Sequence, residues 1–229
     1  WALLAMGGLM LASVGRFVPE SLPPESRHPG GIGIAVHNMR GVVRNRVFVG
    51  YMLMAAFAAF TVVAYVSNSS FVLQEQKGLS ATAFALFFGS TALSQVLLST
   101  LNAKLVLRTD PRRLISLGLT AQAIAISALG VGVIGFGTPL VLTCIGFFVL
   151  MSAQGLVVGN ASSLAVSQAR HVAGTASGLV GVAVAAGWAL SAPLATMETG
   201  SGAIPMVAVM ATGVVGSIAA HASLRRHLS

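Results

Sequence analysis

Charged residues are scarce in this sequence. Asp, Glu, Lys and Arg make up 8% of its 229 residues, whereas soluble domains carry about a quarter. Hydrophobic residues account for 55% and the mean hydropathy is +0.88. This composition excludes an ordinary water-soluble globular protein and points to a chain whose main solvent is the lipid bilayer.

Cysteines, acids and catalytic motifs are equally rare. The single cysteine, Cys144, lies in an apolar stretch and can form neither a disulfide framework nor a cysteine metal site within the chain. No HExxH, GxSxG or Walker sequence occurs. His221 lies near the end of an apolar run, and His171 lies in a loop beside Arg170, where a lone histidine is more often solvated than catalytic. We therefore expect no catalytic residue, no metal site and no cofactor, and a membrane-embedded enzyme is the weaker class of hypothesis.

Long runs without any Asp, Glu, Lys or Arg dominate what is present. Crossing a bilayer takes about 20 helical residues, and six runs meet this length: 47–66, 83–103, 114–136, 139–166, 174–196 and 203–224. The expected fold is an all-α integral membrane protein with six complete transmembrane helices. Residues 1–15 are apolar but too short to cross, and we interpret them as the end of a truncated helix. A signal peptide is the alternative, although a basic residue would then precede the apolar stretch, whereas Arg16 follows it.

Lys and Arg are distributed very unevenly between alternate loops. Lys77 stands alone on one side, and the other side holds the remaining twelve: Arg16, Arg27, Arg40, Arg44, Arg46, Lys104, Arg108, Arg112, Arg113, Arg170, Arg225 and Arg226. Because cytoplasmic loops retain positive charge, the count predicts that the loops at 16–46, 104–113 and 170 and the carboxy terminus are cytoplasmic. The net charge of +8 is thus a topology signal, and no nucleic-acid partner is expected.

The basic loop 16–46 divides into two parts. Its first half is rich in proline and glycine, whereas Ile32, Val36, Met39 and Val43 then recur at helical spacing. This pattern predicts an amphipathic helix in the headgroup plane, and a plain solvated loop is the open alternative. The predicted organisation is therefore 1–15 as the helix end, 16–46 as a central cytoplasmic loop, and 47–229 as a six-helix unit.

Neutral polar and aromatic residues form stripes on three of the predicted helices. At about 100° per residue, Tyr51, Met54, Ala58, Thr61 and Tyr65 share one sector of the first complete helix. The fourth helix has a similar stripe of Phe147, Met151 and Gln154. The stripe of the second helix consists of Phe84, Phe88, Thr91, Gln95 and Asn102. Polar atoms avoid lipid, so each stripe faces either neighbouring helices or a cavity. On the cavity interpretation, the substrate-binding candidates are Tyr51, Met54, Thr61, Tyr65, Gln95, Phe147, Met151 and Gln154.

Small residues line the fifth predicted helix at Gly174, Gly178, Gly181 and Ala185. This spacing permits close helix packing. Static packing and a sliding contact used in transport are both open interpretations.

One long stretch resembles a known family. The run YVSNSSFVLQEQKGLSATAFALFFGSTALSQVLLSTLNAKLVLRTDPRRLISLGL, from Tyr65 to Leu119, resembles the seventh to ninth helices of the Bcr/CflA subfamily of drug-resistance transporters, within the major facilitator superfamily. ESLPPESR, GNASSLAV and AGTASGLVG resemble further segments in the same order. Ser70 departs from a usual proline, which puts the usual helix break there in doubt, and Asp110 departs from a common glycine.

The resemblance implies a twelve-helix, proton-coupled exporter of drugs or similar small molecules in the bacterial inner membrane. This chain would be its carboxy-terminal half, with an amino-terminal six-helix half as partner beside the substrate, protons and the lipid bilayer. The coupling carboxylate would lie in that other half, since the five acids here, Glu20, Glu25, Glu75, Asp110 and Glu198, lie outside the spans. A homodimer of halves and an inactive fragment are the alternatives.

The loop containing Arg108, Asp110, Arg112 and Arg113 would, by the same resemblance, echo a cytoplasmic gating loop. From its residues alone, Asp110 and Pro111 predict a helix N-cap and first-turn proline. The arginines would hold the loop to the anionic leaflet, so a simple topology anchor is the competing interpretation.

The charge distribution predicts which loops an impermeant thiol reagent reaches. Single cysteines placed at Ser80 and Thr199 should react in intact cells, whereas a cysteine at Ser229 should react only after the membrane is opened. Labelling of the Ser229 cysteine from outside would contradict the orientation.

Overall fold

The computed structural model describes residues 1–19, 31–135, 137, 139–196 and 204–228. Within these ranges every regular element is a helix. The helices are α1 (Ala2–Phe17), α2 (Ile32–Arg44), α3 (Arg46–Ser70), α4 (Ala81–Leu105), α5 (Pro111–Gly135), α6 (Leu140–Ser167), α7 (Ala173–Thr196) and α8 (Ile204–Leu228). A π-helical turn, Phe71–Gln76, continues α3, and a short 3₁₀ turn, Arg170–Val172, precedes α7.

Six of the helices are long and apolar enough to cross a membrane. They are α3 with its π-helical turn, α4, α5, α6, α7 and α8, and their apolar segments run from 22 to 31 residues. The expected all-α fold with six complete spans is therefore confirmed. The first span differs in length, because the prediction ended it at residue 66 and the helix continues to Gln76. The polar run Ser67–Ser70 does not end the helix, since Ser69 is buried and Gln74 Nε2 donates to Ser70 Oγ at 2.6 Å.

The chain divides into two compact units, Trp1–Val36 and His37–Ser229. In the first unit, α1 is a helix without buried residues. In the second unit, the end of α2 contributes Val42 to the buried interior, whereas Arg40 and Val43 on the same helix are exposed. The predicted helix in loop 16–46 is thus present as α2, and its position in the headgroup plane stays a prediction.

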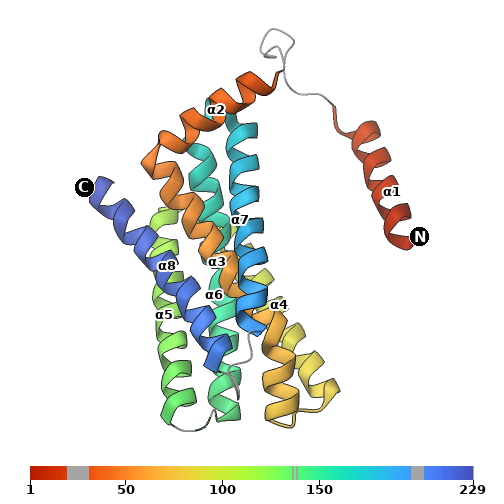
Figure 1. Cartoon of the computed structure of the whole chain (residues 1–229), viewed down its shortest axis with the longest axis vertical. Coiled ribbons are helices and arrows are strands. Elements are labelled where there is room, and N and C mark those ends of the chain that lie inside the picture. The colour runs from red at the N-terminus through yellow and green to blue at the C-terminus, as the bar shows by residue number, and fades with distance from the viewer. Residues whose placement is uncertain (20–30, 136, 138, 197–203, 229) are drawn as a thin grey trace. The chain divides into compact units, whose positions relative to one another are not determined.

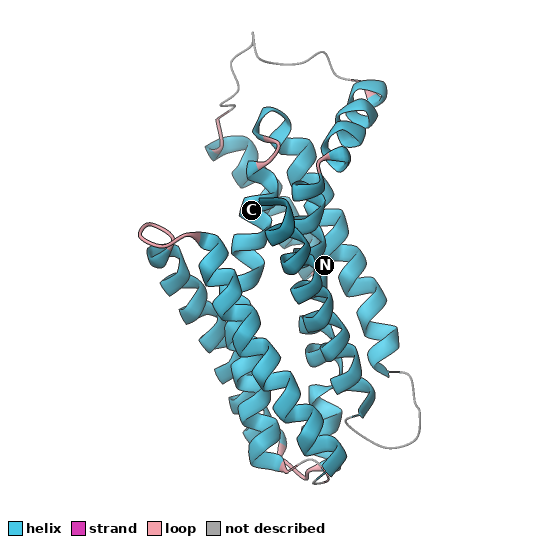
Figure 2. Ribbon diagram, turned by 90° about the vertical axis from the view of Figure 1, so that its left-hand side faces the viewer, coloured by secondary structure: helices cyan, strands magenta, loops and turns pink. Residues whose placement is uncertain are grey.

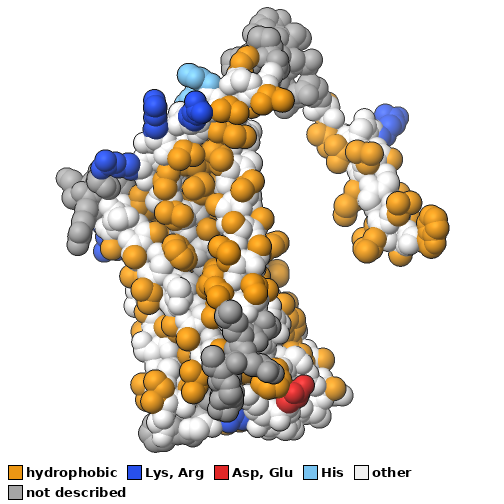
Figure 3. Space-filling view, in the orientation of Figure 1, with side chains coloured by type: hydrophobic (Ala, Val, Ile, Leu, Met, Phe, Trp, Pro, Cys, Tyr) orange, Lys and Arg blue, Asp and Glu red, His pale blue; other side chains and the backbone are white. Residues whose placement is uncertain are grey.

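In the second unit α3 is the central helix. It packs against α6, α7 and α8, while α5 lies between α6 and α8, and α4 packs mainly on α6 (Figures 1 and 2). Since the helices alternate in direction, the basic ends of α3, α5 and α8 lie together. Figure 3 shows Lys and Arg side chains gathered at this end of the bundle, whereas basic and acidic side chains lie near each other toward the opposite end. We call the end of the bundle at which α3 and α5 begin and α8 ends the basic end.

The helices α6, α7 and α8 each donate one side-chain hydrogen bond to a backbone carbonyl of α3. The three bonds run from Gln154 Nε2 of α6 to Ala58 (3.1 Å), from Ser191 Oγ of α7 to Phe60 (2.6 Å) and from Ser217 Oγ of α8 to Met54 (3.4 Å). Such bonds add about 0.6 kcal/mol each in a membrane protein. These bonds form only where the helix backbones lie close together. At Gly213 of α8 the approach to α3 is so close that an added Cβ would lie 2.8 Å from the Phe57 backbone carbonyl oxygen.

A second close approach joins α6 to α4. A Cβ at Gly155 would lie 2.7 Å from the Ser99 nitrogen and 2.8 Å from the Gln95 carbonyl oxygen. Backbone atoms cannot move aside as a flexible side chain can. Gly155 therefore sets how closely α4 packs against α6.

Gly155→Ala should destabilise the protein by about 1–3 kcal/mol, because the added methyl group forces the two helices apart. Gly159→Ala is the matched control on the same helix, since a Cβ there meets nothing within 4 Å. The control should be neutral or stabilising by up to about 1 kcal/mol, as alanine favours helix over glycine. Equal unfolding midpoints in a denaturing-detergent titration would show that the α4–α6 contact is looser than described.

Candidate functional site

The stripe on α3 points into the bundle. Tyr51, Met54, Thr61 and Tyr65 are all at most 2% exposed. They do not form one continuous site, because Tyr65 belongs to a cluster with Phe147 and Met151 of α6, whereas Tyr51 and Met54 pack in a second cluster nearer the basic end. The predicted substrate residues thus divide into two groups along α3.

The first group is aromatic and lies where α3, α4 and α6 meet. The Tyr65 ring stacks on Phe88 with centroids 5.6 Å apart and meets Phe147 edge-on at 5.3 Å. The Tyr65 hydroxyl shares a hydrogen bond of 3.1 Å with Thr91 Oγ1. Met151 is buried in the same cluster. Aromatic faces attract cations, and methionine adapts to irregular shapes, so this group has the chemistry to hold an apolar or cationic compound.

Gln154 lies on the same helix as Phe147 and Met151. Its Nε2 donates to the Ala58 carbonyl at 3.1 Å, and its buried Oε1 has no hydrogen-bond partner among the described residues. A buried acceptor without a partner carries a desolvation cost of about 1–3 kcal/mol. Gln154 can therefore accept a hydrogen bond from a ligand without breaking an existing one.

Gln122 of α5 has a similar feature that our sequence reasoning missed. Its side chain is buried, and its Nε2 lacks a partner in the described part of the chain. The signal was available, because an amide stood alone in the apolar run 114–136. Lipid supplies no hydrogen-bond partner for such a group. Gln122 is therefore a candidate functional residue, as Gln154 is.

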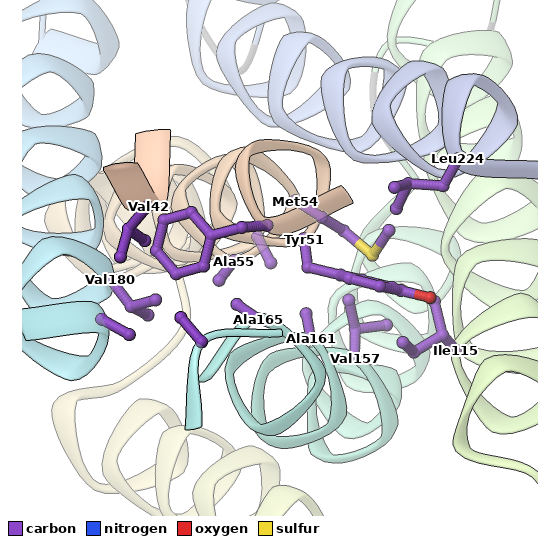
Figure 4. Packing of buried hydrophobic residues seen from close by; sticks show 14 of the residues in the cluster. Val42, Tyr51, Met54, Ala55, Ile115, Val157, Ala161, Ala165, Val180 and Leu224 are labelled. Carbon is purple, nitrogen blue, oxygen red and sulfur yellow. The ribbon is translucent and has the colours of Figure 1, made fainter. Parts of the chain in front are cut away.

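The second group is a packed core. Figure 4 shows Tyr51 lying between α3, α6 and α8, with its hydroxyl directed toward Ile115 of α5. Met54 and Leu224 belong to the same cluster. Thr61, further along α3, donates to the Phe57 carbonyl of its own helix at 3.2 Å. The contacts of Tyr51 and Met54 account for their burial through helix packing.

On α4, the stripe faces α6 through a series of polar pairs. Asn102 and Asn160 exchange two amide hydrogen bonds of 3.2 and 2.8 Å, and Ser94 Oγ and Ser152 Oγ are 2.7 Å apart. Gln95 is half-buried, and its backbone carbonyl oxygen, not its side-chain amide, faces Gly155. The sequence stripe included Asn102, but its partner Asn160 could not be identified from periodicity.

The predicted gating loop lies at the basic end. Asp110 Oδ1 accepts a hydrogen bond of 2.8 Å from the Arg112 backbone N–H, and α5 begins at Pro111, which confirms the predicted cap. Arg112 and Arg113 stand in the first turn of α5, and Arg108 is exposed in the preceding loop. Beside them, Ser116 Oγ of α5 and His221 Nε2 of α8 share a hydrogen bond of 2.9 Å. The helix α5, which begins at the end of this loop, is therefore joined to α8 by a hydrogen bond between residues 105 positions apart.

These features define a multi-pass membrane protein with polar groups inside a six-helix bundle. The sequence matches the Major Facilitator Superfamily over residues 1–192. The chain belongs to this superfamily of membrane transporters, and its six spans are consistent with one half of the superfamily's fold.

Two curated relatives agree with this assignment. The chain is 30% identical over 218 residues to the MFS-type transporter YdgK of Bacillus subtilis, covering 95% of this chain and 54% of the relative. It is 26% identical over 230 residues to the bicyclomycin resistance protein homolog of Haemophilus influenzae, covering 95% of this chain and 55% of the relative. The chain thus spans about half the length of the curated relatives it matches.

Two substitutions at Tyr65 separate its ring from its hydroxyl. Tyr65→Phe should cost less than about 1 kcal/mol, the usual value of a hydrogen bond within a membrane, because Thr91 Oγ1 keeps its bond to the Phe88 carbonyl. Tyr65→Ala removes the ring and should cost about 3–5 kcal/mol. Unfolding titrations of both variants measure this difference, and equal losses would mean that the hydroxyl, and not ring packing, holds the cluster.

Proposed function

We propose that this chain forms the carboxy-terminal half of a proton-coupled exporter of drugs or similar small molecules in the bacterial inner membrane, with its carboxy terminus in the cytoplasm. The observation that carries the proposal is the aromatic group of Tyr65, Phe88 and Phe147 beside Met151 and the half-satisfied Gln154. A relative whose name refers to bicyclomycin resistance supports the choice of drugs as substrates. The uneven distribution of Lys and Arg supports the orientation.

A second six-helix half is the proposed partner. Of the six spans, α4 and α7 bury the smallest share of their apolar residues within this bundle. Gly174, Gly178 and Gly181 of α7 have open space where a Cβ would stand. These two helices therefore offer the surface on which an amino-terminal half would pack, with the substrate held near the midplane between the halves.

Substrate would enter between the halves and reach the aromatic group from the α4 side. In this proposal Tyr65, Phe147, Met151 and Gln154 contact the compound, and Gln95 of α4 lies on the path. Tyr51, Met54 and Thr61 position α3 behind them. Arg108, Asp110, Arg112 and Arg113 form a gating loop whose movement accompanies opening at the cytoplasmic end.

Proton coupling is assigned to the other half. Driving export with protons requires a group that titrates near neutral pH within the membrane. The six predicted spans contain no Asp or Glu, and Glu75 is exposed near the end of the longer first span of the structure. His221 lies near the end of α8 and accepts a hydrogen bond from Arg225. Tyrosine and glutamine do not titrate in this range. This half would then supply substrate contacts and the moving surface.

The proposal predicts compound-dependent effects in a transporter containing both halves. Gln154→Met keeps the side-chain length but removes the acceptor, so export of compounds that donate a hydrogen bond to it should fall about fivefold, in line with about 1 kcal/mol per bond. Export of purely apolar compounds should change little. The measurement is the efflux rate of several fluorescent substrates, normalised to the amount of protein in the membrane.

Thr212→Val is the control, because Thr212 is exposed and bonds only the Ala208 carbonyl of its own helix in the described structure. It should leave every rate unchanged. If Gln154→Met lowers all rates in proportion to protein level, its role is helix packing and the substrate assignment fails.

A further inference from the structure

A pocket at the basic end lies apart from the aromatic group. It has a volume of about 360 Å³ and is lined by Tyr51, Arg112, Arg113, Ser116, Leu224 and Arg225, together with His221. Its arginines come from the first turn of α5 and the last part of α8. The start of a helix also carries a partial positive charge, so the pocket combines three guanidinium groups with a helix N-terminus.

The charge of Arg225 is held in place but not neutralised by its neighbours. Its Nη2 donates to Ser116 Oγ at 2.7 Å, and its Nε donates to His221 Nε2 at 3.2 Å. Both acceptors are neutral groups. Arg225 is thus oriented toward the pocket at little conformational cost to a later ligand.

Asp110 is the acid closest in sequence to Arg112 and Arg113. One of its carboxylate oxygens caps α5 by accepting from the Arg112 backbone N–H. One carboxylate against three arginines leaves the pocket with an excess of positive charge. The electrostatics therefore favour an anion that carries several acceptor oxygens, as a phosphate group does.

A second crevice continues from the pocket along α5 and α8, away from the basic end. It has a volume of about 330 Å³ and shares Ser116, His221 and Arg225 with the pocket. Its remaining lining is mostly apolar and includes Leu119, Ala123, Ile124, Ile218 and Ala222. From Ser116 to Ile124 the crevice follows α5 for about 12 Å, at 1.5 Å per residue. Ile124 is 66% exposed, so the crevice opens on the lipid-facing surface.

We propose that the pocket and crevice together bind one anionic phospholipid, with its phosphate on Arg112, Arg113 and Arg225 and one acyl chain between α5 and α8. A free phosphate would use the arginines but leave the apolar crevice unfilled. A zwitterionic lipid would bring a cationic group to a basic pocket. Basic pockets between transmembrane helices are suited to anionic headgroups, and the bound lipid would tie the start of α5 to the end of α8.

The test is native mass spectrometry of the 229-residue chain, purified in a neutral detergent and mixed with lipid. Phosphatidylglycerol should bind at least about tenfold more tightly than phosphatidylcholine with the same palmitoyl and oleoyl chains. Arg113→Gln combined with Arg225→Gln should weaken phosphatidylglycerol binding by about 25-fold, or about fivefold per arginine.

Lys104→Gln combined with Arg170→Gln is the matched control. Both residues are exposed at the same end and neither lines the pocket or the crevice, so the same loss of charge should change binding less than twofold. Equal weakening by the two double variants would mean that lipid binds the basic surface in general, which overturns the proposal. Thermal melting of each variant confirms that it is folded.

Two further arms identify the source of the phosphate. Ala123→Trp fills the apolar crevice without touching the arginines and should weaken phosphatidylglycerol binding at least about fivefold. Inorganic phosphate should not displace the lipid. Unchanged binding by Ala123→Trp, or displacement by inorganic phosphate, would identify a site for a small anion and contradict a lipid site.

Discussion

The hydrogen bonds that α6, α7 and α8 donate to the backbone of α3 are the contacts on which the bundle depends. Lipid offers no hydrogen bonds, so a polar side chain within a span needs a partner in the protein. Gln154, Ser191 and Ser217 find theirs in the backbone carbonyls of Ala58, Phe60 and Met54, within about two turns of α3. Small residues such as Gly213 allow the necessary approach, and α3 is thereby enclosed on three sides.

This arrangement leaves the outer helices with different tasks. Because α3 and α6 take up the interior, α4 and α7 keep large exposed apolar surfaces, and α4 packs mainly on α6, with which it also forms polar pairs. A surface of this kind inside a membrane can face lipid or another protein. In the proposed exporter it faces the amino-terminal half, while α5 and α8 face lipid and offer the phospholipid site.

The helices and their buried faces could be predicted from the sequence, but the residue pairs that form hydrogen bonds between helices could not. Runs without charge identified six spans, a 100° periodicity placed Tyr51, Met54, Thr61 and Tyr65 on one buried face, and Asp110 was correctly assigned as a cap. Periodicity contains no information on which residue lies opposite, so Tyr65 with Thr91, Asn102 with Asn160 and Ser116 with His221 emerged only from the fold. The end of α3 was also missed, because burial of Ser69 depends on its neighbours and not on its polarity.

The central claim is that this chain supplies one half of an exporter and transports only together with the other half. The most direct measurement is proton-gradient-driven efflux of a cationic dye from vesicles that contain either the 229-residue chain alone or a chain that also carries an amino-terminal six-helix half. The account predicts uncoupler-sensitive efflux from the second preparation and none from the first, since Glu75, the one carboxylate within the six structural spans, is exposed near the end of the first span. Robust uncoupler-sensitive efflux from the 229-residue chain alone would contradict it and indicate a functional homodimer.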